Sequence, residues 1–365
     1  MPKYDYLVVG AGMFGGVFSH EASKAGKSVL VVERRDHIGG NCYTQEIDGI
    51  HVHVYGPHIF HCKKKYLWDY VNQFAEFNNF SLRGRVRFGD TVYSFPINLM
   101  TFQQLWGINT PERAEKKLAE LKTHCTNPQN FRDWIVSEVG EEIYEIFFRG
   151  YTTKQWNRDP SELPSSIVKR LPRPRTQFND RYFDDPYEGI PVGGYTQIFQ
   201  KMLRDADIEL KTDFLSNRDE LEKLAGRIIY TGPIDEFFDC CYGKLEYRSL
   251  HWEHEHLDGD YQGAAVVNYG SLEVPFTRII EHKHFEMSDV PNTIITREYP
   301  APYDGNNIPC YPVRDEKNAA LHKQYQKLSE GSGVVFGGRL GSFEYYDMHM
   351  AIAAALTLAQ KELGS

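Results

Sequence analysis

Near its start the chain reads Tyr6-Leu7-Val8-Val9-Gly10-Ala11-Gly12-Met13-Phe14-Gly15, an apolar run that ends in the pattern G-x-G-x-x-G. The apolar run predicts a buried parallel strand, and residues 14–25 predict a helix after it. The three glycines permit a tight turn between them, and they let backbone amides approach a pyrophosphate. The helix N-terminus adds a partial positive charge. The stretch therefore predicts a dinucleotide-binding β-α-β fold, with contacts from Gly10, Gly12, Met13, Phe14 and Gly15.

The second strand of this fold, residues 28–33, ends in Glu33. A carboxylate at this place can accept hydrogen bonds from both ribose hydroxyls of an adenosine, and it repels a 2′-phosphate. The neighbouring Arg34 and Arg35 could soften that repulsion. Next comes the turn Gly39-Gly40-Asn41, where two glycines let the chain pass close to the cofactor a second time. This E-x5-G-G arrangement resembles the glutathione-reductase-like proteins and favours FAD over NAD.

The C-terminal end of the chain supports the same cofactor. An apolar strand at 334–336 runs into Gly337-Gly338-Arg339, and a helix is expected over 347–363. FAD proteins of this kind return to the flavin here, with Arg339 near the pyrophosphate and the helix dipole directed at the ring. The remaining predicted cofactor contacts are Arg34, Gly40, Asn41, His58, Tyr346, Asp347 and Met348.

Length, charge and cysteine content exclude several classes of protein. A chain of 365 residues is longer than one core usually supports. Its net charge of −9 and the lack of a dense basic run beyond Lys63-Lys64-Lys65 argue against a nucleic-acid partner. None of the six cysteines forms a C-x-x-C pair, and no apolar run reaches the roughly 18 residues of a membrane span. We therefore expect a soluble cytoplasmic protein with reduced thiols and no membrane insertion.

The middle of the chain changes character twice. Residues 63–77, 111–125 and 130–150 predict helices, the last two within a small helical unit. Residues 160–191 are rich in proline and predict an extended, looped path. The stretch 245–295 alternates and is rich in β-branched and aromatic residues, which predicts antiparallel strands.

Seven further motifs follow one another: Gly56-Pro57-His58-Ile59-Phe60-His61, Gly150-Tyr151-Thr152-Thr153-Lys154-Gln155-Trp156, Gly189-Ile190-Pro191-Val192-Gly193-Gly194-Tyr195, Tyr230-Thr231-Gly232-Pro233-Ile234-Asp235, Thr277-Arg278-Ile279-Ile280-Glu281-His282-Lys283-His284-Phe285, Tyr311-Pro312-Val313 and Tyr345-Tyr346-Asp347-Met348-His349. In this order and spacing they resemble the bacterial UDP-galactopyranose mutases over essentially the whole chain. The resemblance implies an α/β fold of three parts. They are a discontinuous Rossmann-like FAD domain (1–80, 190–240 and 312–365), an inserted helical domain (98–165) and an antiparallel sheet domain (81–97, 166–189 and 241–311).

The implied reaction interconverts UDP-galactopyranose and UDP-galactofuranose, with reduced FAD as the active cofactor. In that family the flavin N5 is the nucleophile at the anomeric carbon and UDP is the leaving group. The protein must then hold the anomeric carbon near N5, stabilise the diphosphate and exclude water. We also predict a homodimer.

The resemblance also assigns roles to individual residues. Arg170 and Arg278 would clamp the diphosphate, since delocalised guanidiniums suit a growing negative charge. His58 would face the flavin, and the sugar or phosphate would meet Asn268. Tyr151 and Trp156 would lie against the uridine, beside the polar Thr152 and Gln155. The tyrosines expected to donate hydroxyls to phosphate oxygens are Tyr182, Tyr311 and Tyr345.

The segment around Arg170 departs from the family, because it holds one residue more before Tyr182, within Arg173-Pro174-Arg175. Arg175 could therefore compete for the phosphate. We expect the proline-rich segment to act as a lid that closes over the UDP-sugar.

Four histidines, His51, His53, His58 and His61, raise the question of a metal site. His51 and His53 alternate and so share a face of a strand, but no carboxylate or thiolate nearby in the sequence completes a ligand set. We therefore expect no metal.

Three other functions stay open at this stage. They are a net redox enzyme of the amine-oxidase or desaturase type, a flavin-binding protein with a structural or sensing role, and a mutase for UDP-N-acetylgalactopyranose or a dTDP-6-deoxyhexose. His58 in place of an arginine favours plain galactose within the family.

Overall fold

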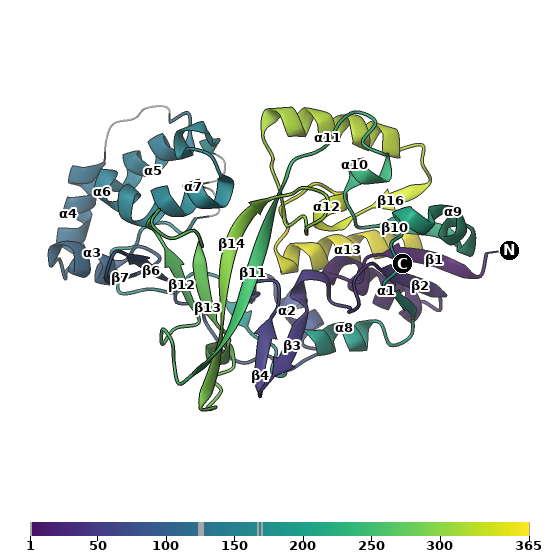
Figure 1. Ribbon diagram of the computed structural model, residues 1–365, viewed down its shortest axis with the longest axis horizontal. Coiled ribbons are helices and arrows are strands. Elements are labelled where there is room, and N and C mark those ends of the chain that lie inside the picture. Colours follow the sequence, from purple (N-terminus) through teal and green to yellow (C-terminus); the bar gives the residue numbers. More distant parts are fainter. Residues whose placement is uncertain (1, 123–127, 166–167, 169–170, 365) are drawn as a thin grey trace. The chain divides into compact units, whose positions relative to one another are not determined.

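The computed structural model describes residues 2–122, 128–165, 168 and 171–364. The chain forms two compact units, each built from separate stretches of sequence (Figure 1). Unit 1 comprises Met1–Asn79, Pro186–Ser249 and Pro302–Ser365, and unit 2 comprises Phe80–Asp185 and Leu250–Ala301. Among the described residues, no helix has both the length and the apolar character to cross a membrane. The three-domain division, like the cytoplasmic location, stays a prediction.

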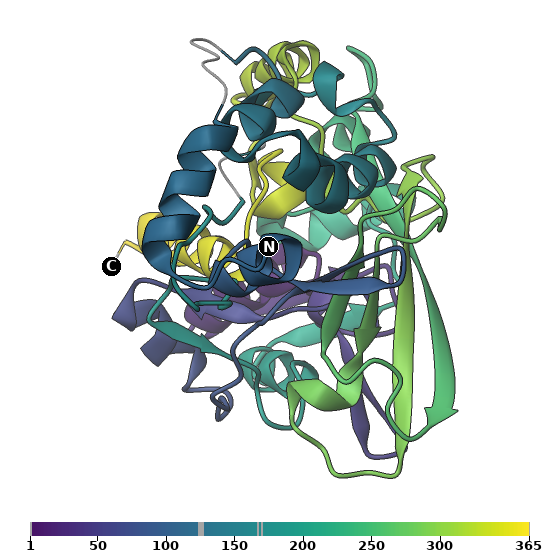
Figure 2. The same ribbon diagram turned by 90° about the vertical axis from the view of Figure 1, so that its left-hand side faces the viewer.

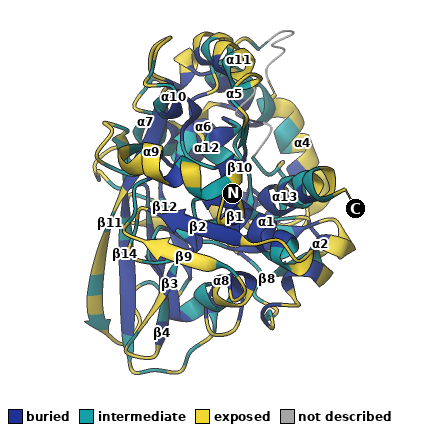
Figure 3. Cartoon of the chain, turned by 90° about the vertical axis from the view of Figure 1, so that its right-hand side faces the viewer, coloured by how far each residue is buried: buried dark blue, intermediate teal, exposed yellow. Residues whose placement is uncertain are grey.

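Unit 1 is built on a parallel sheet in the order β16-β10-β1-β2-β9. Its strands are β1 (Tyr4–Val9), β2 (Val29–Glu33), β9 (Asp207–Leu210), β10 (Ala225–Tyr230) and β16 (Val334–Phe336). Within the sheet Val8 pairs with Val31 on one side and with Ile229 on the other. The sequence thus predicted the β-α-β start correctly. In Figure 3 β1 and β2 are buried, whereas the edge strand β9 is exposed.

Side chains alternate across this sheet and bury its two faces in different cores. Val8 and Val31 face α1 (Met13–Lys24) and α13 (Met348–Leu363), whose residue Ile352 is fully buried. Leu7 and Leu30 face the other way, toward Phe214 and Phe237. Because both faces are covered, these strands read as continuous apolar runs in the sequence.

Apart from α11, the other elements of unit 1 are short. They are β3 (Thr44–Ile47), β4 (Ile50–His53), β5 (Phe60–Cys62), α2 (Lys65–Val71), β8 (Tyr187–Gly189), α8 (Thr196–Met202), α9 (Arg218–Leu221), α10 (Ile234–Phe237), β15 (Tyr311–Pro312), α11 (Glu316–Ser329) and α12 (Gly338–Gly341). Helix α2 is shorter than the 63–77 predicted for it: it ends at Val71, and the side chain of the next residue, Asn72, donates a hydrogen bond to the carbonyl of Trp68.

Unit 2 combines a sheet with a group of helices. Its strands are β6 (Arg85–Phe88), β7 (Thr91–Ser94), β11 (Tyr247–Asp258, which begins in unit 1), β12 (Val266–Tyr269), β13 (Arg278–Glu281) and β14 (Asn292–Pro302). They pair in the order β11-β14-β13-β12-β6-β7, and the sheet is antiparallel except where β12 meets β6. In Figure 2 the blue helices and the green strands of this unit occupy different parts of it.

The helices of unit 2 correct one prediction. We expected a single helix over 130–150, but Gly140, with φ 81°, ends α5 (Phe131–Val139). The chain then turns into α6 (Glu141–Tyr144), a π-helical turn (Glu145–Arg149) and α7 (Gly150–Trp156). Glycine after a helix is the usual residue for such a stop, so the sequence held the signal. The unit also contains α3 (Leu99–Trp106) and α4 (Pro111–Leu121).

Candidate active site

A cleft opens in unit 1 at the carboxyl ends of its parallel strands, with a cavity volume of about 240 Å³. Its walls include Gly10 after β1, Glu33 at the end of β2, Thr231 after β10 and Gly338 after β16. Ligands of open α/β sheets bind at this edge, where loops diverge from neighbouring strands.

The structure brings all of the predicted cofactor contacts together in this one cleft, although they come from four distant parts of the sequence. The lining includes Gly10, Gly12, Met13, Phe14, Gly15, Glu33, Arg34, Gly40, Asn41, His58, Arg339, Tyr346, Asp347 and Met348.

Two glycines of the cleft, Gly15 and Gly40, allow contacts that no side chain would permit. A Cβ on Gly15 would lie 2.0 Å from the carbonyl oxygen of Gly10, which itself has φ +103°. A Cβ on Gly40 would lie 2.9 Å from the Cα of Gly12. The second glycine turn therefore packs directly against the first.

Glu33 is buried at the floor of the cleft and is held by two backbone amides. Its carboxylate accepts hydrogen bonds from the amides of Ala11 and Arg35, each at 3.0 Å. A carboxylate has about four lone-pair sites, so it keeps acceptor capacity for ribose hydroxyls. The Arg35 side chain donates to Asn41 Oδ1 at 2.7 Å and lies over the ring of Tyr55. Arg34 is exposed on the cleft wall.

Arg339 lines the cleft and is held there by backbone carbonyls. It donates from Nη1 to the carbonyl of Cys310 at 3.1 Å and from Nη2 to that of Tyr346 at 2.6 Å. Its guanidinium carbon also lies 5.5 Å from the ring centres of Tyr311 and Tyr345. Those two rings stack with centroids 4.9 Å apart. Arg339 thus joins the two predicted phosphate-binding tyrosines to the cleft wall.

His58 lines the cleft in a fixed orientation. Its Nδ1 lies 2.8 Å from the carbonyl oxygen of Gly56, and its backbone amide donates to His53 Nδ1 at 3.1 Å. Cys42, which we did not predict, lines the same cleft. Burial raises the pKa of the Cys42 thiol to about 12, so this sulfur stays protonated and is not a nucleophile near neutral pH.

The cleft wall also contains segments that were not predicted as cofactor contacts. Among them are Thr212–Leu215, after β9, and Tyr230–Pro233, at the end of β10. Their signal was positional, because the first follows β9 and the second follows β10, and both strands end at the same edge of the sheet as β1. Recognising it requires the strand order, which the sequence does not display.

In unit 2 three polar residues form a row across neighbouring strands. Asn268 on β12 lies opposite Arg278 on β13, and Arg278 lies opposite Glu298 on β14. Arg278 Nη2 donates to Glu298 Oε2 at 2.8 Å, and its Nε lies 2.8 Å from Oε1. Glu298 is 1% exposed and also accepts from the Trp252 indole at 3.2 Å. The carboxylate therefore fixes the plane of the Arg278 guanidinium, an effect that the sequence analysis missed.

Helix α7 carries four of the predicted substrate residues: Tyr151, Thr152, Gln155 and Trp156. It is anchored to the strand–turn segment after β12 by Lys154, whose ammonium donates to three backbone carbonyls, those of Tyr269, Ser271 and Phe276. Burial lowers the pKa of Lys154 to about 8. At the helix start, a Cβ on Gly150 would lie 2.0 Å from the carbonyl oxygen of Gly270. Thr152 is buried, whereas the other three are partly accessible.

Tyr182 packs on the aromatic core of unit 2, with its ring 6.1 Å from that of Phe95. The neighbouring Arg175 donates to the carbonyls of Asn179 and Arg181 and to Asp184. It is therefore held by its own loop, which argues against the competition for phosphate that we considered. Arg170 lies outside the described residues, together with part of the predicted lid.

Comparison with known proteins identifies the family. The family model for UDP-galactopyranose mutase matches residues 146–345, and a model for NAD(P)-binding Rossmann-like domains matches residues 8–74. A probable UDP-galactopyranose mutase of Klebsiella pneumoniae is 40% identical over 100% of this chain and 96% of its own length. A dTDP-fucopyranose mutase of Escherichia coli is 37% identical over 97% of each chain.

Solved structures show the same fold. A reduced UDP-galactopyranose mutase superposes with a TM-score of 0.78 at 15% identity, covering 100% of this chain and 94% of that one. A putrescine oxidase variant gives a TM-score of 0.58 at 12% identity, covering 99% of both chains. Such low identities establish the fold alone, and the fold is shared with oxidases. Since the family model and the full-length relatives agree, the chain belongs to the UDP-galactopyranose mutase family.

Proposed function

We propose that this protein interconverts UDP-galactopyranose and UDP-galactofuranose and that it does so with reduced FAD bound in the cleft of unit 1. The observation that carries the proposal is the row of Asn268, Arg278 and Glu298, a pre-oriented arginine in a chain that belongs to the mutase family. An enzyme that releases a nucleoside diphosphate needs such a cation in a fixed place.

The cleft fits FAD on its own chemistry. Two glycine turns in contact give backbone amides access to a pyrophosphate, and the buried Glu33 supplies a carboxylate for ribose hydroxyls. Helices α1 and α13 both begin at residues that line the cleft, and the partial positive charges at their N-termini favour an anionic cofactor. When bound and reduced, FAD supplies a nucleophile for the anomeric carbon.

Arg278 would bind the diphosphate and stabilise the charge that develops as UDP leaves. Glu298 holds the guanidinium in one plane through two close contacts, which reduces the reorganisation needed during the reaction. Arg170, named by the family resemblance, would supply the second cation. Asn268, opposite Arg278 in the ladder, would contact the sugar or phosphate.

The remaining residues would position the nucleotide and keep water away. Trp156 and Tyr151 would lie against the uridine, with Thr152 and Gln155 beside them on α7. The hydroxyls of Tyr182, Tyr311 and Tyr345 would donate to phosphate oxygens. Tyr311 and Tyr345 are already held as a stacked pair by Arg339.

A second substrate class has a specific observation in its favour. The dTDP-fucopyranose mutase is 37% identical over nearly the full chain, almost as similar as the Klebsiella protein. Fucose lacks the 6-hydroxyl of galactose, and dTDP differs from UDP in a methyl group on the base and a missing 2′-hydroxyl. The two substrates therefore place different demands on a few positions of the sugar and nucleotide pockets. Overall identity therefore does not choose between them.

The test is an anaerobic assay of dithionite-reduced protein with UDP-galactofuranose and, separately, dTDP-fucofuranose, with chromatography of the nucleotide sugars. We expect conversion of UDP-galactofuranose to the pyranose, with Arg278→Ala lowering kcat by about 10²–10³-fold. Arg297→Ala is the matched control, because Arg297 also pairs with a carboxylate, Glu255, but lies on the opposite face of the same sheet.

If the protein prefers dTDP-fucofuranose, the proposed substrate is wrong, but the proposed reaction class, a pyranose–furanose mutase, still holds. No conversion of either sugar by protein that retains its flavin would overturn the proposed function.

A further inference from the structure

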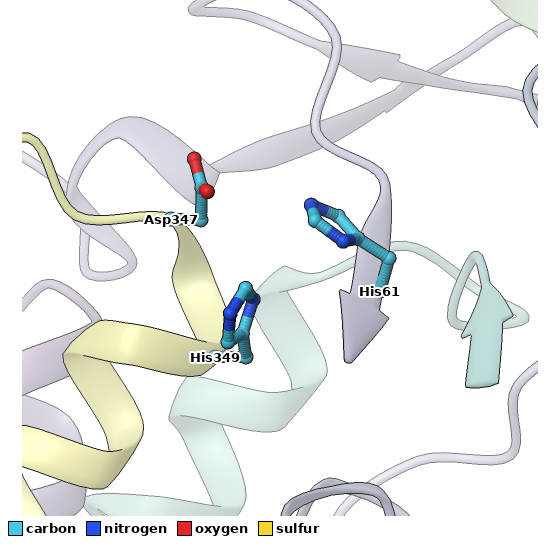
Figure 4. A group of neighbouring side chains, drawn as sticks. All are labelled: His61, Asp347 and His349. Atoms are coloured by element: carbon cyan, nitrogen blue, oxygen red, sulfur yellow. The ribbon is translucent and has the colours of Figure 1, made fainter. Parts of the chain in front are cut away.

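Three potential metal ligands lie together in unit 1: His61, Asp347 and His349 (Figure 4). One ligand atom of each lies within 4.8 Å of one ligand atom of each of the others. The two imidazole rings have centroids 5.1 Å apart and meet edge to face at 69°. We propose that these residues bind one divalent transition-metal ion of the zinc class, a site beyond the function proposed above.

The backbone fixes the three side chains independently of any ion. His61 lies in the middle of β5, between Phe60 and Cys62, which are both fully buried in the core of unit 1. Because side chains alternate along a strand, His61 projects from the opposite face. Asp347 immediately precedes α13 and His349 lies in its first turn, and β5 packs against this helix. The site therefore rests on two rigid elements.

A fourth residue supports this arrangement. Glu188 on β8 lies directly opposite His61 in the β5–β8 ladder, so both side chains leave the same face of the sheet. Metal-binding histidines commonly donate their second ring N–H to a carboxylate, which orients the ring and raises its basicity. Glu188 is in the register position for that role or for direct coordination.

The chemistry of the set selects the class of ion. Two imidazoles and one carboxylate are the ligands of zinc and of its neighbours cobalt and nickel, whereas calcium and magnesium prefer oxygen alone. In a tetrahedral zinc site the ligand atoms are about 3.3 Å apart, so side-chain rotations must close the group slightly. The N-terminus of α13 carries a partial positive charge that disfavours a cation, and the negative charge of Asp347 offsets it.

A second cluster of potential ligands, Asp260, Glu281 and His284 in unit 2, makes a useful contrast. Glu281 already accepts from three backbone amides and the hydroxyl of Thr293. Lys283 forms an ion pair with Asp260 at 2.5 Å, so a protein cation already occupies this position. The hydrogen bonds and the ion pair of this second cluster therefore give it a structural role within unit 2.

The proposed ion would connect β5 to the wall of the cofactor cleft. Asp347 and its neighbour Met348 both line the cleft, so metal binding and the conformation of this wall are linked. Any ion that binds only the folded protein also raises its apparent melting temperature. Neither effect depends on turnover, which keeps this inference separable from the mutase proposal.

The test uses the full-length flavin-containing protein without a histidine tag, stripped of metal by chelation. Titration with ZnCl2 by calorimetry, and with CoCl2 by visible absorption, reports stoichiometry and ligand field. We expect one ion per chain, tetrahedral cobalt bands and a raised melting temperature. His61→Ala and His349→Ala should each weaken binding by at least about tenfold, and Glu188→Gln should weaken it by a smaller factor.

His51→Ala is the control, since His51 lies on β4 and its Nε2 approaches Glu46 at 4.0 Å. His349→Gln, checked by circular dichroism, replaces His349→Ala if that variant fails to fold. Absence of one-to-one binding in the wild type would overturn the proposal. Binding that is equally strong in the two histidine variants, or lost in His51→Ala, would overturn it as well.

Discussion

At the scale of single residues, the ion pair between Arg278 and Glu298 is the feature most directly tied to the proposed chemistry. A guanidinium that is held by two contacts to a buried carboxylate keeps its orientation while a substrate binds and leaves. The carboxylate also neutralises part of the positive charge. Glu298 is therefore a positioning residue, and it should affect turnover more than nucleotide affinity.

We expect Glu298→Gln to lower kcat by about 10–100-fold, because small displacements of a catalytic group are costly. The Kd for UDP should not rise, since the arginine loses its neutralising partner. Initial rates and UDP calorimetry on one preparation separate the two effects. Glu255→Gln, which breaks the ion pair with Arg297 on the same sheet, should leave both values unchanged. A purely structural role for Glu298 would instead weaken UDP binding and kcat together.

His282 gives unit 2 a predicted pH dependence. It is buried, and its Nε2 lies 2.6 Å from the hydroxyl of Thr296. Burial, with a smaller contribution from His254, lowers its pKa from 6.5 to about 3. Between these values the unfolded chain binds a proton that the folded chain does not, so stability falls as the pH falls from 6.5 toward 3.

The expected contribution of His282 is a loss of up to about 1.4 kcal/mol per pH unit in this window. His282→Asn does not titrate, so its urea-unfolding midpoint should depend less on pH than that of the wild type between pH 7 and pH 5. Parallel pH dependences of the two proteins would contradict the assignment.

The same residue scale shows what the sequence could and could not predict. Glu33 was predictable because its distance from the glycine turn is set by one helix and one strand. Glu298 was not, since its partner Arg278 lies twenty residues away and only the strand register brings them together. Asp347 and His349 were likewise absent from the metal argument around His61, because α13 reaches β5 only in the folded chain.

At the scale of elements, the turn between β1 and α1 is the part on which cofactor binding depends most directly. Gly12 lines the cleft, but a Cβ there would meet only the Cα of Gly40, at an ordinary 3.7 Å. Its φ of −83° is also open to alanine. The fold should therefore tolerate Gly12→Ala, whereas a methyl group in the cleft should obstruct the cofactor.

We expect Gly12→Ala to fold and to bind FAD about tenfold or more weakly, the effect of moderate overpacking. Flavin released on denaturation, per mole of protein, measures this after dialysis. Gly226→Ala on β10 is the control, because its Cβ would meet nothing closer than 3.6 Å and the residue does not line the cleft. Full flavin content in Gly12→Ala would contradict the placement of the cofactor.

Helix boundaries were the least predictable elements. The helix breaks at Gly140, which has a positive φ. Gly140 also packs closely against Leu121 of α4, since a Cβ on Gly140 would lie 3.1 Å from the Leu121 side chain. The amphipathic pattern continues on both sides of this glycine, which led us to predict one helix over 130–150. Tertiary packing against α4 decided the outcome.

At the scale of the whole molecule, each unit is assembled from distant stretches of the chain. The parallel sheet was predictable because apolar runs at 6–9, 28–33 and 334–336 all precede glycine-rich turns. The complete strand order was not, since β9 and β10 come from the middle of the sequence. The homodimer stays a prediction, which light scattering of the purified protein would test.

The dependence of the mutase reaction on reduced flavin is tested most directly by comparing one preparation in two redox states. The purified protein, with its flavin content measured, is incubated anaerobically with UDP-galactofuranose either oxidised or after reduction by dithionite. We expect UDP-galactopyranose from the reduced protein alone, with no net consumption of reductant during turnover. Equal conversion in both states, or conversion that consumes reductant in proportion to product, would contradict this expectation.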